Sequence, residues 1–252
     1  MPQEILLPVT DPRIVTELDA LAKRYRGAAG PVMQVLGFIG GSAETLLNRL
    51  PAPVRSGLEG ATERALTTAL GAASRSRHVV GDRPDWVNRA LTTAMGAAGG
   101  FGGLAGSAAE LPFTVTMLLR AIQGIAAEHG FDPDSEEVRI ECLRVFASAG
   151  PLEKDDGTDM GFFAAKMTVT GQGLNRLVAK VAPKLAAVLG QKLAAQTAPV
   201  LGAVAGAAVN YAFTSYYQEV AHVHFGLKRL AVDSREDEGL LREELVARMT
   251  RR

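Results

Sequence analysis

Glu110 is the residue whose surroundings most favour a chemical role. It is the only charged residue between Arg89 and Arg120, and an isolated carboxylate among apolar residues must be paired or have a raised pKa. Two structural explanations compete with a functional one. Ser107-x-x-Glu110 fits a helix capping box, and Arg120 is a candidate ion-pair partner. We keep Glu110 and Arg120 as candidate ligand-binding residues.

Six glycines crowd the segment 96–106, which reads GAAGGFGGLAG. Its best match to a dinucleotide fingerprint is Gly100-x-Gly102-x-x-Ala105, but no strand precedes it, as that motif requires. A phosphate-binding loop ending in Gly-Lys-Ser/Thr is absent from the sequence. Because each glycine costs a solvated helix about 1 kcal/mol relative to alanine, we expect either a loop or a helix that another backbone approaches closely.

No other constellation predicts a metal, a cofactor or a nucleophile. Glu219-x-x-His222 is a single Glu-x-x-His pair, whereas helical di-iron sites need two, and His224 points elsewhere on a helix. The acidic loop 153–161 lacks the spacing of a calcium loop. Cys142 lies among apolar residues, which favours a structural thiol. There is no Gly-x-Ser-x-Gly elbow. We predict no metal, no cofactor and no catalytic residue.

Composition limits the partners and the compartment. The chain has 252 residues, a formal net charge of zero and one cysteine. Zero net charge gives no bulk attraction to nucleic acid, and a lone cysteine suits a reducing compartment. The first 15 residues lack the pattern of a secretory signal. We therefore expect a cytoplasmic protein, free or peripheral at the inner face of the cell membrane.

The spacing of apolar residues and caps predicts an all-α fold, a compact multi-helix domain with closely packed Gly/Ala-rich helices. We expect a domain over residues 1–231 and a charged helical tail over 232–252, where Leu241, Leu245 and Met249 form one stripe. The expected helices cover about 12–26, 32–50, 54–73, 86 onward, 112–129 and 133–149, with two or three between 162 and 231 that break near Pro183 and Pro199.

An internal echo links two of these helices. Residues 64–73 read RALTTALGAA and residues 89–98 read RALTTAMGAA. Without further copies this does not indicate a solenoid. We expect two similar amphipathic helices packed side by side.

The segment 193–218 has no charged side chain and is long enough to span a bilayer. Its few large apolar residues make insertion marginal. Gly202-x-x-x-Gly206 and the nearby Asn210 suit close contact between helices in water or in lipid. We favour a buried helix hairpin around Pro199, and a segment that contacts lipid is the alternative.

Two stretches together resemble the EcsC protein family. The first is Ala109-Glu110-Leu111-Pro112, followed by 119–126 and by Gly130-Phe131-Asp132; the second is 198–202, followed by 206–213 and by His224-Phe225. The likeness covers roughly residues 10–231. It implies a bacterial, intracellular helical protein with an accessory role, either free or associated with the membrane. The family takes its name from an operon that also encodes an ABC exporter. It transfers no catalytic residue.

The function expected from the sequence is that of a non-enzymatic accessory or scaffold protein at the membrane face, linked to an ABC exporter. The alternative is an enzyme or a binder of lipid or small molecules, with a pocket around Glu110, Arg120 and Asn210. The partners left open are the membrane surface, a membrane protein and a second copy of the chain. Nucleic acid is not expected.

Overall fold

The computed structural model describes residues 10–28, 30, 48, 50–101, 103–146, 174–196 and 202–250. These residues form helices and, within these ranges, no strand, so the prediction of an all-α fold is confirmed. The helices are α1 (Pro12–Ala28), α4 (Ala52–Val80), α5 (Asp85–Phe101), α6 (Gly103–Glu128), α7 (Glu136–Phe146), α9 (Leu174–Gln196), α10 (Gly202–Ser234) and α11 (Glu238–Thr250).

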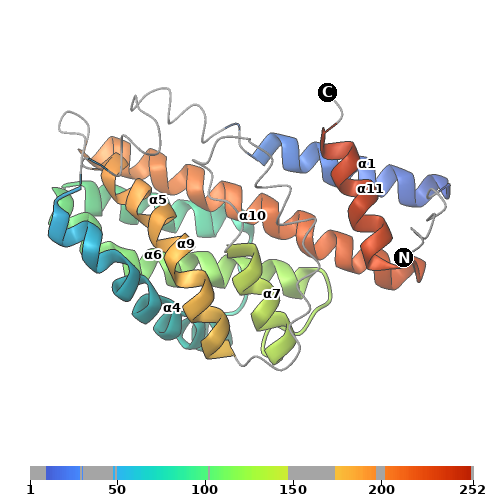
Figure 1. Ribbon diagram of the computed structural model, residues 1–252, viewed down its shortest axis with the longest axis horizontal. Helices are drawn as coiled ribbons and strands as arrows, with labels where there is room; N and C mark the ends of the chain where they lie inside the picture. Colours follow the sequence, from blue (N-terminus) through green and yellow to red (C-terminus); the bar gives the residue numbers. More distant parts are fainter. Residues whose placement is uncertain are drawn as a thin grey trace, which may run out of the picture.

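Helix α10 runs the length of the molecule and organises the rest (Figure 1). Its first half packs along α5, and its second half carries α1, which α11 also contacts. Helix α6 lies between α4 and α5, and α9 packs against α4. The core is aliphatic with a few aromatic rings from α7 and α10, including Leu66, Leu119, Ile122, Phe146, Phe213 and Tyr217.

The described residues of the glycine-rich segment, 96–101 and 103–106, are helical, and the bare face of α5 touches another backbone. A Cβ atom added at Gly96 of α5 would collide with the carbonyl oxygen of Gly206 on α10 and would lie 2.6 Å from Asn210 Nδ2. Only glycine permits such an approach. The expectation of a helix that another backbone approaches closely is therefore confirmed. The Gly202-x-x-x-Gly206 face of α10 makes its close contact with α5.

Two prolines lie inside helices, where the sequence predicted a start or a break. Pro112 is the tenth residue of α6, and Pro183 lies within α9. An interior proline removes one backbone hydrogen bond and costs about 3 kcal/mol. Burial of apolar residues on both sides of Pro183, among them Ala182 and Leu185, offsets this cost. Ser107 is consequently inside α6, and the predicted capping box is wrong.

Other boundaries also differ from the expectation. Helix α4 continues to Val80, which leaves only residues 81–84 as the connection to α5. Helix α7 begins at Glu136, because Ser135 caps it by accepting a hydrogen bond of 3.3 Å from the Val138 amide. The expected helix over 32–50, the acidic loop 153–161 and Pro199 lie outside the described residues, apart from residues 48 and 50.

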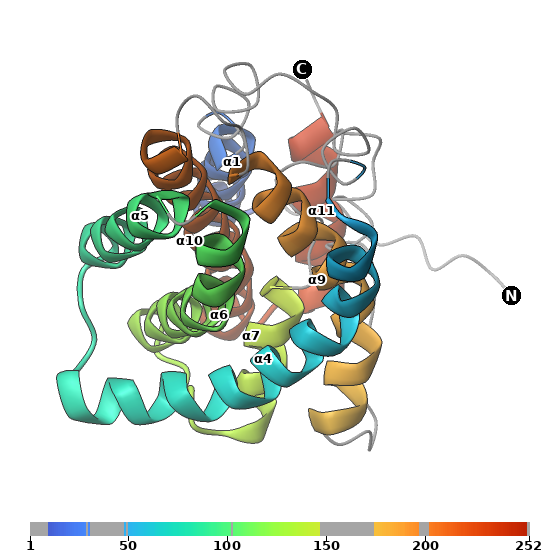
Figure 2. The ribbon, with the colours of Figure 1, turned by 90° about the vertical axis from the view of Figure 1, so that its left-hand side faces the viewer.

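The two echo helices are not side by side. Helices α4 and α5 make at most marginal contact, and each packs instead on α6. In Figure 2, α5 lies at the left edge of the molecule, and α4 runs along its lower edge. The prediction of a paired repeat is wrong, because their apolar faces have different partners.

The C-terminal helix α11 buries the predicted stripe of Leu241, Leu245 and Met249, and packs mainly on α1. The division into a domain and a tail stays a prediction. Among the described residues, no helix is long and apolar enough to cross a membrane.

Candidate functional site

Four helices bring polar side chains to one buried point. Glu110 and Thr114 come from α6, Lys192 from α9, Asn210 from α10 and Thr92 from α5. All five residues are at least 95 % buried. Glu110 and Thr114 stand one helical turn apart, and therefore on one face of α6. These side chains form one buried polar cluster between the four helices.

The contacts converge on one carboxylate oxygen. Glu110 Oε1 accepts hydrogen bonds from Thr114 Oγ1 at 2.5 Å and from Asn210 Nδ2 at 2.6 Å. Lys192 Nζ donates to the same oxygen at 3.2 Å and to Thr114 Oγ1 at 3.1 Å. Asn210 Nδ2 also donates to the Thr92 carbonyl oxygen at 2.7 Å. The cluster ties α5, α6, α9 and α10 together.

Two acceptor oxygens of this cluster remain without a donor. Glu110 Oε2 and Asn210 Oδ1 are buried and have no hydrogen-bond partner among the described residues. A Cβ atom added at Gly99 would collide with Glu110 Oε2, so the glycine leaves the space that this oxygen occupies. Buried acceptors without a donor cost free energy. A water molecule or a ligand donor would satisfy them.

The ionic state of the pair follows from its surroundings. Burial opposes ionisation of Glu110, but the charge of Lys192 and the donors Thr114 and Asn210 outweigh it, so the Glu110 pKa lies below its usual value. Burial lowers the pKa of Lys192 to about 8, although Glu110 opposes the decrease. Glu110 is thus a paired carboxylate. Its partner is Lys192 and not Arg120.

Arg120 lies elsewhere. It is ten residues beyond Glu110, which corresponds to about 15 Å along α6. Its guanidinium donates to Ser76 Oγ at 3.0 Å and to the carbonyl oxygen of Gly81, and so holds the end of α4 and the turn that follows. Of the three predicted site residues, the structure brings Glu110 and Asn210 together and separates Arg120 from them.

Sequence reasoning missed Lys192 and Thr114. A signal for Lys192 was present, because it follows Leu185 and Leu189 by seven and three residues and therefore shares their helical face. A lysine within such an apolar stripe indicates burial and hence a partner. Its pairing with a residue 82 positions away could not be read from spacing.

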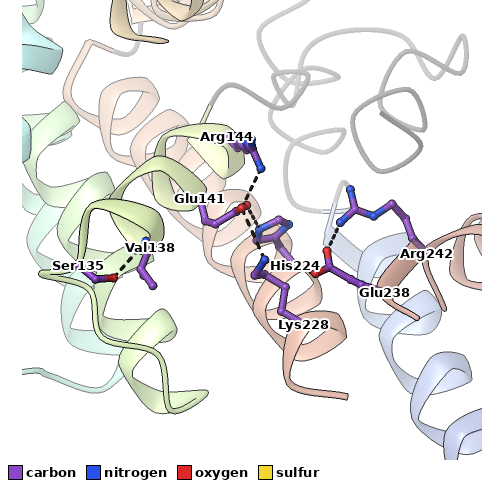
Figure 3. Close-up of polar contacts among 8 residues, drawn as sticks. All are labelled: Ser135, Val138, Glu141, Arg144, His224, Lys228, Glu238 and Arg242. Atoms are coloured by element: carbon purple, nitrogen blue, oxygen red, sulfur yellow. Dashed lines mark hydrogen bonds and ion pairs between the residues drawn. The ribbon is translucent and has the colours of Figure 1, made fainter. Parts of the chain in front are cut away.

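A second buried ionic cluster joins α7, α10 and α11 (Figure 3). Glu141 Oε2 lies 2.9 Å from His224 Nε2, and Arg144 Nη1 donates to Glu141 Oε1 at 2.8 Å. Lys228 Nζ lies 3.6 Å from Glu141 Oε1 and 3.4 Å from Glu238 Oε2. Lys228 thus connects α7 to α11. These side chains bind one another, which points to a structural role.

The sole cysteine shows no sign of reactivity. Cys142 is fully buried. Burial raises the pKa of its thiol, as does the nearby carboxylate of Glu141. A protonated, inaccessible thiol is a poor nucleophile, in keeping with the structural role inferred from its apolar neighbours.

The outward face of α5 is apolar. Between residues 85 and 99 of α5, the exposed residues are Trp86, Ala90, Leu91, Ala94 and Ala98, and Trp86 and Leu91 expose 65 % and 45 % of their surface. Single exposed apolar residues are ordinary, but a helix face composed of them indicates an interaction surface. We call these five residues the α5 face.

The α5 face is the counterpart of a core face in α4. In the echo, Ala90, Leu91, Ala94 and Ala98 correspond to Ala65, Leu66, Ala69 and Ala73, and these four residues of α4 are at least 92 % buried. Helix α4 uses this face to pack against α6 and α9. Helix α5 turns the same face outward.

The opposite orientation of this face in α4 and α5 has a structural cause. Thr92 and Gly96 of α5 face α10, where Thr92 accepts the hydrogen bond from Asn210 and Gly96 meets Gly206. The equivalent residues of α4 are Thr67, which is exposed, and Gly71, which is half-buried. The polar and small positions of the pattern are therefore the buried side of α5.

This geometry defines a class of protein: an all-α protein in which four helices surround a buried ionic cluster. The EcsC protein family matches residues 86–230. The chain therefore belongs to the EcsC protein family, as the resemblance indicated. The match begins at α5 and ends in α10, so that it contains Glu110, Lys192 and Asn210. Comparison with curated proteins and with solved structures gave no match.

Proposed function

We propose that this protein is a non-enzymatic accessory or scaffold protein that docks on the surface of a membrane through the α5 face. The single observation that carries the proposal is the inverted echo, by which we mean the repeated pattern whose apolar face is buried in α4 and exposed in α5. A pattern that forms core in α4 is exposed in α5 from Ala90 to Ala98, over about two and a half helical turns, and it bears no charge on that side. Exposed apolar helix faces of this kind are buried when the protein meets its partner.

A lipid surface suits this face because of what flanks it. The turn between α4 and α5 lies at the same edge of the molecule as α5 (Figure 2). The last two residues of α4, Val79 and Val80, lie directly before this turn, and their side chains are exposed. Arg83 lies in this turn and Arg75 lies five residues before the end of α4; both are exposed, and within the described part of the chain neither forms an ion pair. Apolar side chains with free arginines beside them match the boundary between acyl chains and anionic headgroups.

Trp86 allows a direct test, because it is the only tryptophan of the chain. The full-length protein is mixed with vesicles of phosphatidylcholine and phosphatidylglycerol, and with vesicles of phosphatidylcholine alone. We expect a blue shift of Trp86 emission with the anionic vesicles, and protection from a water-soluble quencher, because the indole leaves water. Unchanged emission and no flotation with anionic vesicles would overturn the proposal.

A matched pair of variants identifies the surface. Leu91→Glu puts a charge in the middle of the α5 face, and we expect it to weaken vesicle binding about tenfold or more. Thr68→Glu puts the same charge on the exposed side of α4, and it should leave binding close to wild type. Equal losses in both variants would indicate a charge effect without a defined face.

A small-molecule binder remains the second candidate function, because Glu110 Oε2 and Asn210 Oδ1 lack donors. Native mass spectrometry of protein purified from its own cells would detect a bound compound. The candidate requires an adduct that Glu110→Gln loses and Arg120→Gln retains, since Arg120 lies outside the cluster. An adduct-free wild-type protein would refute it. An enzymatic activity and a link to an ABC exporter also stay proposals. No residue of this chain is assigned to either.

A further inference from the structure

Two histidines and an aspartate form a chain of contacts that neither the Glu110 cluster nor the α5 face includes. His129 directly follows α6, His222 belongs to α10, and Asp85 begins α5. His129 Nε2 lies 3.2 Å from His222 Nδ1, and His222 Nε2 lies 3.0 Å from Asp85 Oδ2. We propose that His129 and His222 form a pH-sensitive latch, which holds the end of α6 on α10 while at most one of the two rings is charged and opens when both are.

The contact with Asp85 determines where the hydrogens of the neutral pair lie. Burial opposes ionisation of Asp85, but the hydrogen bond and charge of His222 and two nearby arginines outweigh it, so the Asp85 pKa lies below its usual value. An ionised carboxylate only accepts hydrogen bonds, so His222 Nε2 carries a hydrogen and donates it to Asp85. In neutral His222 the other nitrogen, Nδ1, then carries a lone pair, to which His129 Nε2 donates. One hydrogen therefore lies between the two rings.

The same geometry accepts one extra proton but not two. When His222 is protonated, both of its ring nitrogens donate, and His129 keeps the contact by carrying its hydrogen on Nδ1 and accepting at Nε2. The hydrogen bond reverses its direction, and the rings stay where they are. When His129 is protonated as well, two N–H groups of like charge face each other across 3.2 Å. This contact is repulsive, so the rings must separate.

The surroundings of His129 make the second proton costly. Burial lowers the pKa of His129 to about 4, and the charges of His222, Arg24 and Arg229 act in the same direction. The carbonyl end of α6 favours a charge on His129, but this effect is smaller than that of burial and the cationic neighbours together. Within the described part of the chain, no carboxylate forms an ion pair with His129, whereas His222 has Asp85.

Charged groups from each helix around the pair contribute to this balance. They are Arg24 of α1, Asp82 of the turn after α4, Asp85 and Arg89 of α5, Glu128 of α6, and Glu219, Arg229 and Asp233 of α10. The two arginines that act on His129 are paired, Arg24 with Glu219 and Arg229 with Asp233. Burial raises the pKa of Glu128, as do the charges of Asp85 and Asp82. Glu128 therefore loses its charge early as the pH falls, and it gives little support to a charge on His129.

Packing fixes the position of the latch between α6 and α10. Gly130, with a φ of +81°, ends α6, and the Phe131 amide donates to the carbonyl oxygen of Ala126 at 3.0 Å. A Cβ atom added at Gly226 of α10 would lie 3.5 Å from His129 Cε1, so the ring lies directly on the backbone of α10. Separation of the two rings therefore moves the end of α6 away from α10.

The first test is a pH titration of the full-length wild type, followed by NMR of the histidine side chains. The chain has four histidines, and their ring nitrogen shifts report which nitrogen carries a hydrogen. We expect His222 to carry its hydrogen on Nε2 at pH 8, and His129 to become charged only close to pH 4. The backbone amide signals of Gly130 and Gly226 should shift in the same step. Two rings that become charged independently at about pH 6.5 would overturn the proposal.

A second test uses His129→Gln, because glutamine keeps an N–H donor for His222 but takes up no proton. The pKa of His129 is about 6.5 in the unfolded chain, and burial lowers it to about 4 in the folded protein. The contribution of the neutral ring to stability is therefore complete above about pH 6.5 and is lost as the pH falls toward 4. Between pH 7 and pH 4.5, the equilibrium constant for unfolding in urea should rise about 50-fold more in the wild type than in His129→Gln.

His78→Gln is the matched control, because His78 is exposed and contacts Asp134 of the connection before α7. Its pH dependence should stay close to that of the wild type. The same pH dependence in the wild type and in His129→Gln would overturn the proposal, and so would a His78→Gln variant that loses as much of the dependence as His129→Gln. If His129→Gln does not fold, the titration of the wild type decides.

Discussion

Lys192 and Glu110 form an ion pair within the core, with Nζ 3.2 Å from Oε1 and both side chains almost without exposure to solvent. The pair comes from α9 and α6, and Asn210 and Thr114 add hydrogen bonds to it. A buried pair gains attraction but loses hydration, so its net contribution to stability is small. Its effect on which helix packing the chain adopts is larger, because a packing that buried one of the two charges without the other would be costly.

Removal of one partner should therefore destabilise the fold more than removal of both. We expect Lys192→Met to reduce the free energy of unfolding by about 3–5 kcal/mol, because Glu110 is left buried and unpaired. The double variant Lys192→Met/Glu110→Gln should recover part of this loss. Urea unfolding followed by circular dichroism measures both. Lys23→Met, on an exposed lysine of α1, is the control. Fully additive losses would contradict the pairing.

Glu141 should make stability depend on pH in the acid range. Burial opposes its ionisation, but the hydrogen bond from His224 and the charges of His224, Lys228 and Arg144 lower its pKa to about 2. The unfolded chain takes up this proton at about pH 4.3. Because the folded value is depressed, the contribution of Glu141 is complete above about pH 4.3 and is lost as the pH falls toward 2.

A matched pair of variants isolates this contribution. Glu141→Gln should destabilise the protein at pH 7 by about 3–5 kcal/mol, because His224 and Lys228 lose a buried partner. The difference from wild type should shrink between pH 4 and pH 2. Glu137→Gln, on an exposed residue of the same helix, should have little effect at any pH. Urea unfolding at a series of pH values is the measurement, and a pH-independent difference would contradict the assignment.

The helices and the isolation of Glu110 could be predicted from sequence, since both follow from local pattern. The partner of Glu110 could not be predicted, because it lies on a helix that is distant along the chain and meets Glu110 only through tertiary packing. Arg120 was the nearest cation in sequence, yet it lies about three turns away along the same helix. Lys192 is 82 residues away in sequence, and it faces Glu110 only once α9 packs against α6.

The orientation of α5 was beyond sequence reasoning for a different reason. Residues 64–73 and 89–98 have the same apolar pattern, so the pattern predicts the same buried face for both helices. The contact of Gly96 with Gly206 decides between the two faces, together with the hydrogen bond from Asn210 to Thr92. These are tertiary contacts, and they outweigh the tendency of the apolar residues of α5 to be buried.

The contact between Gly96 and Gly206 predicts opposite effects of one substitution at two helical glycines. Gly96→Ala should destabilise the protein by about 1–3 kcal/mol, because the new methyl group collides with the backbone of α10. Gly57→Ala, in α4, meets nothing within 4 Å, and it should stabilise by about 0.5–1 kcal/mol because alanine favours the helix. Thermal unfolding distinguishes them. A stabilising Gly96→Ala would show that α5 and α10 are further apart.

The inverted echo predicts that equivalent residues tolerate charge differently. Ala69 and Ala94 occupy the same position of the repeated pattern, but Ala69 is 1 % exposed and Ala94 belongs to the α5 face. Ala69→Glu should cost more than about 4 kcal/mol or prevent folding, because it buries an unpaired carboxylate. Ala94→Glu should change the free energy of unfolding by no more than about 0.5 kcal/mol. Chemical unfolding of both variants gives the comparison, and similar costs would mean that the α5 face is covered within the protein itself.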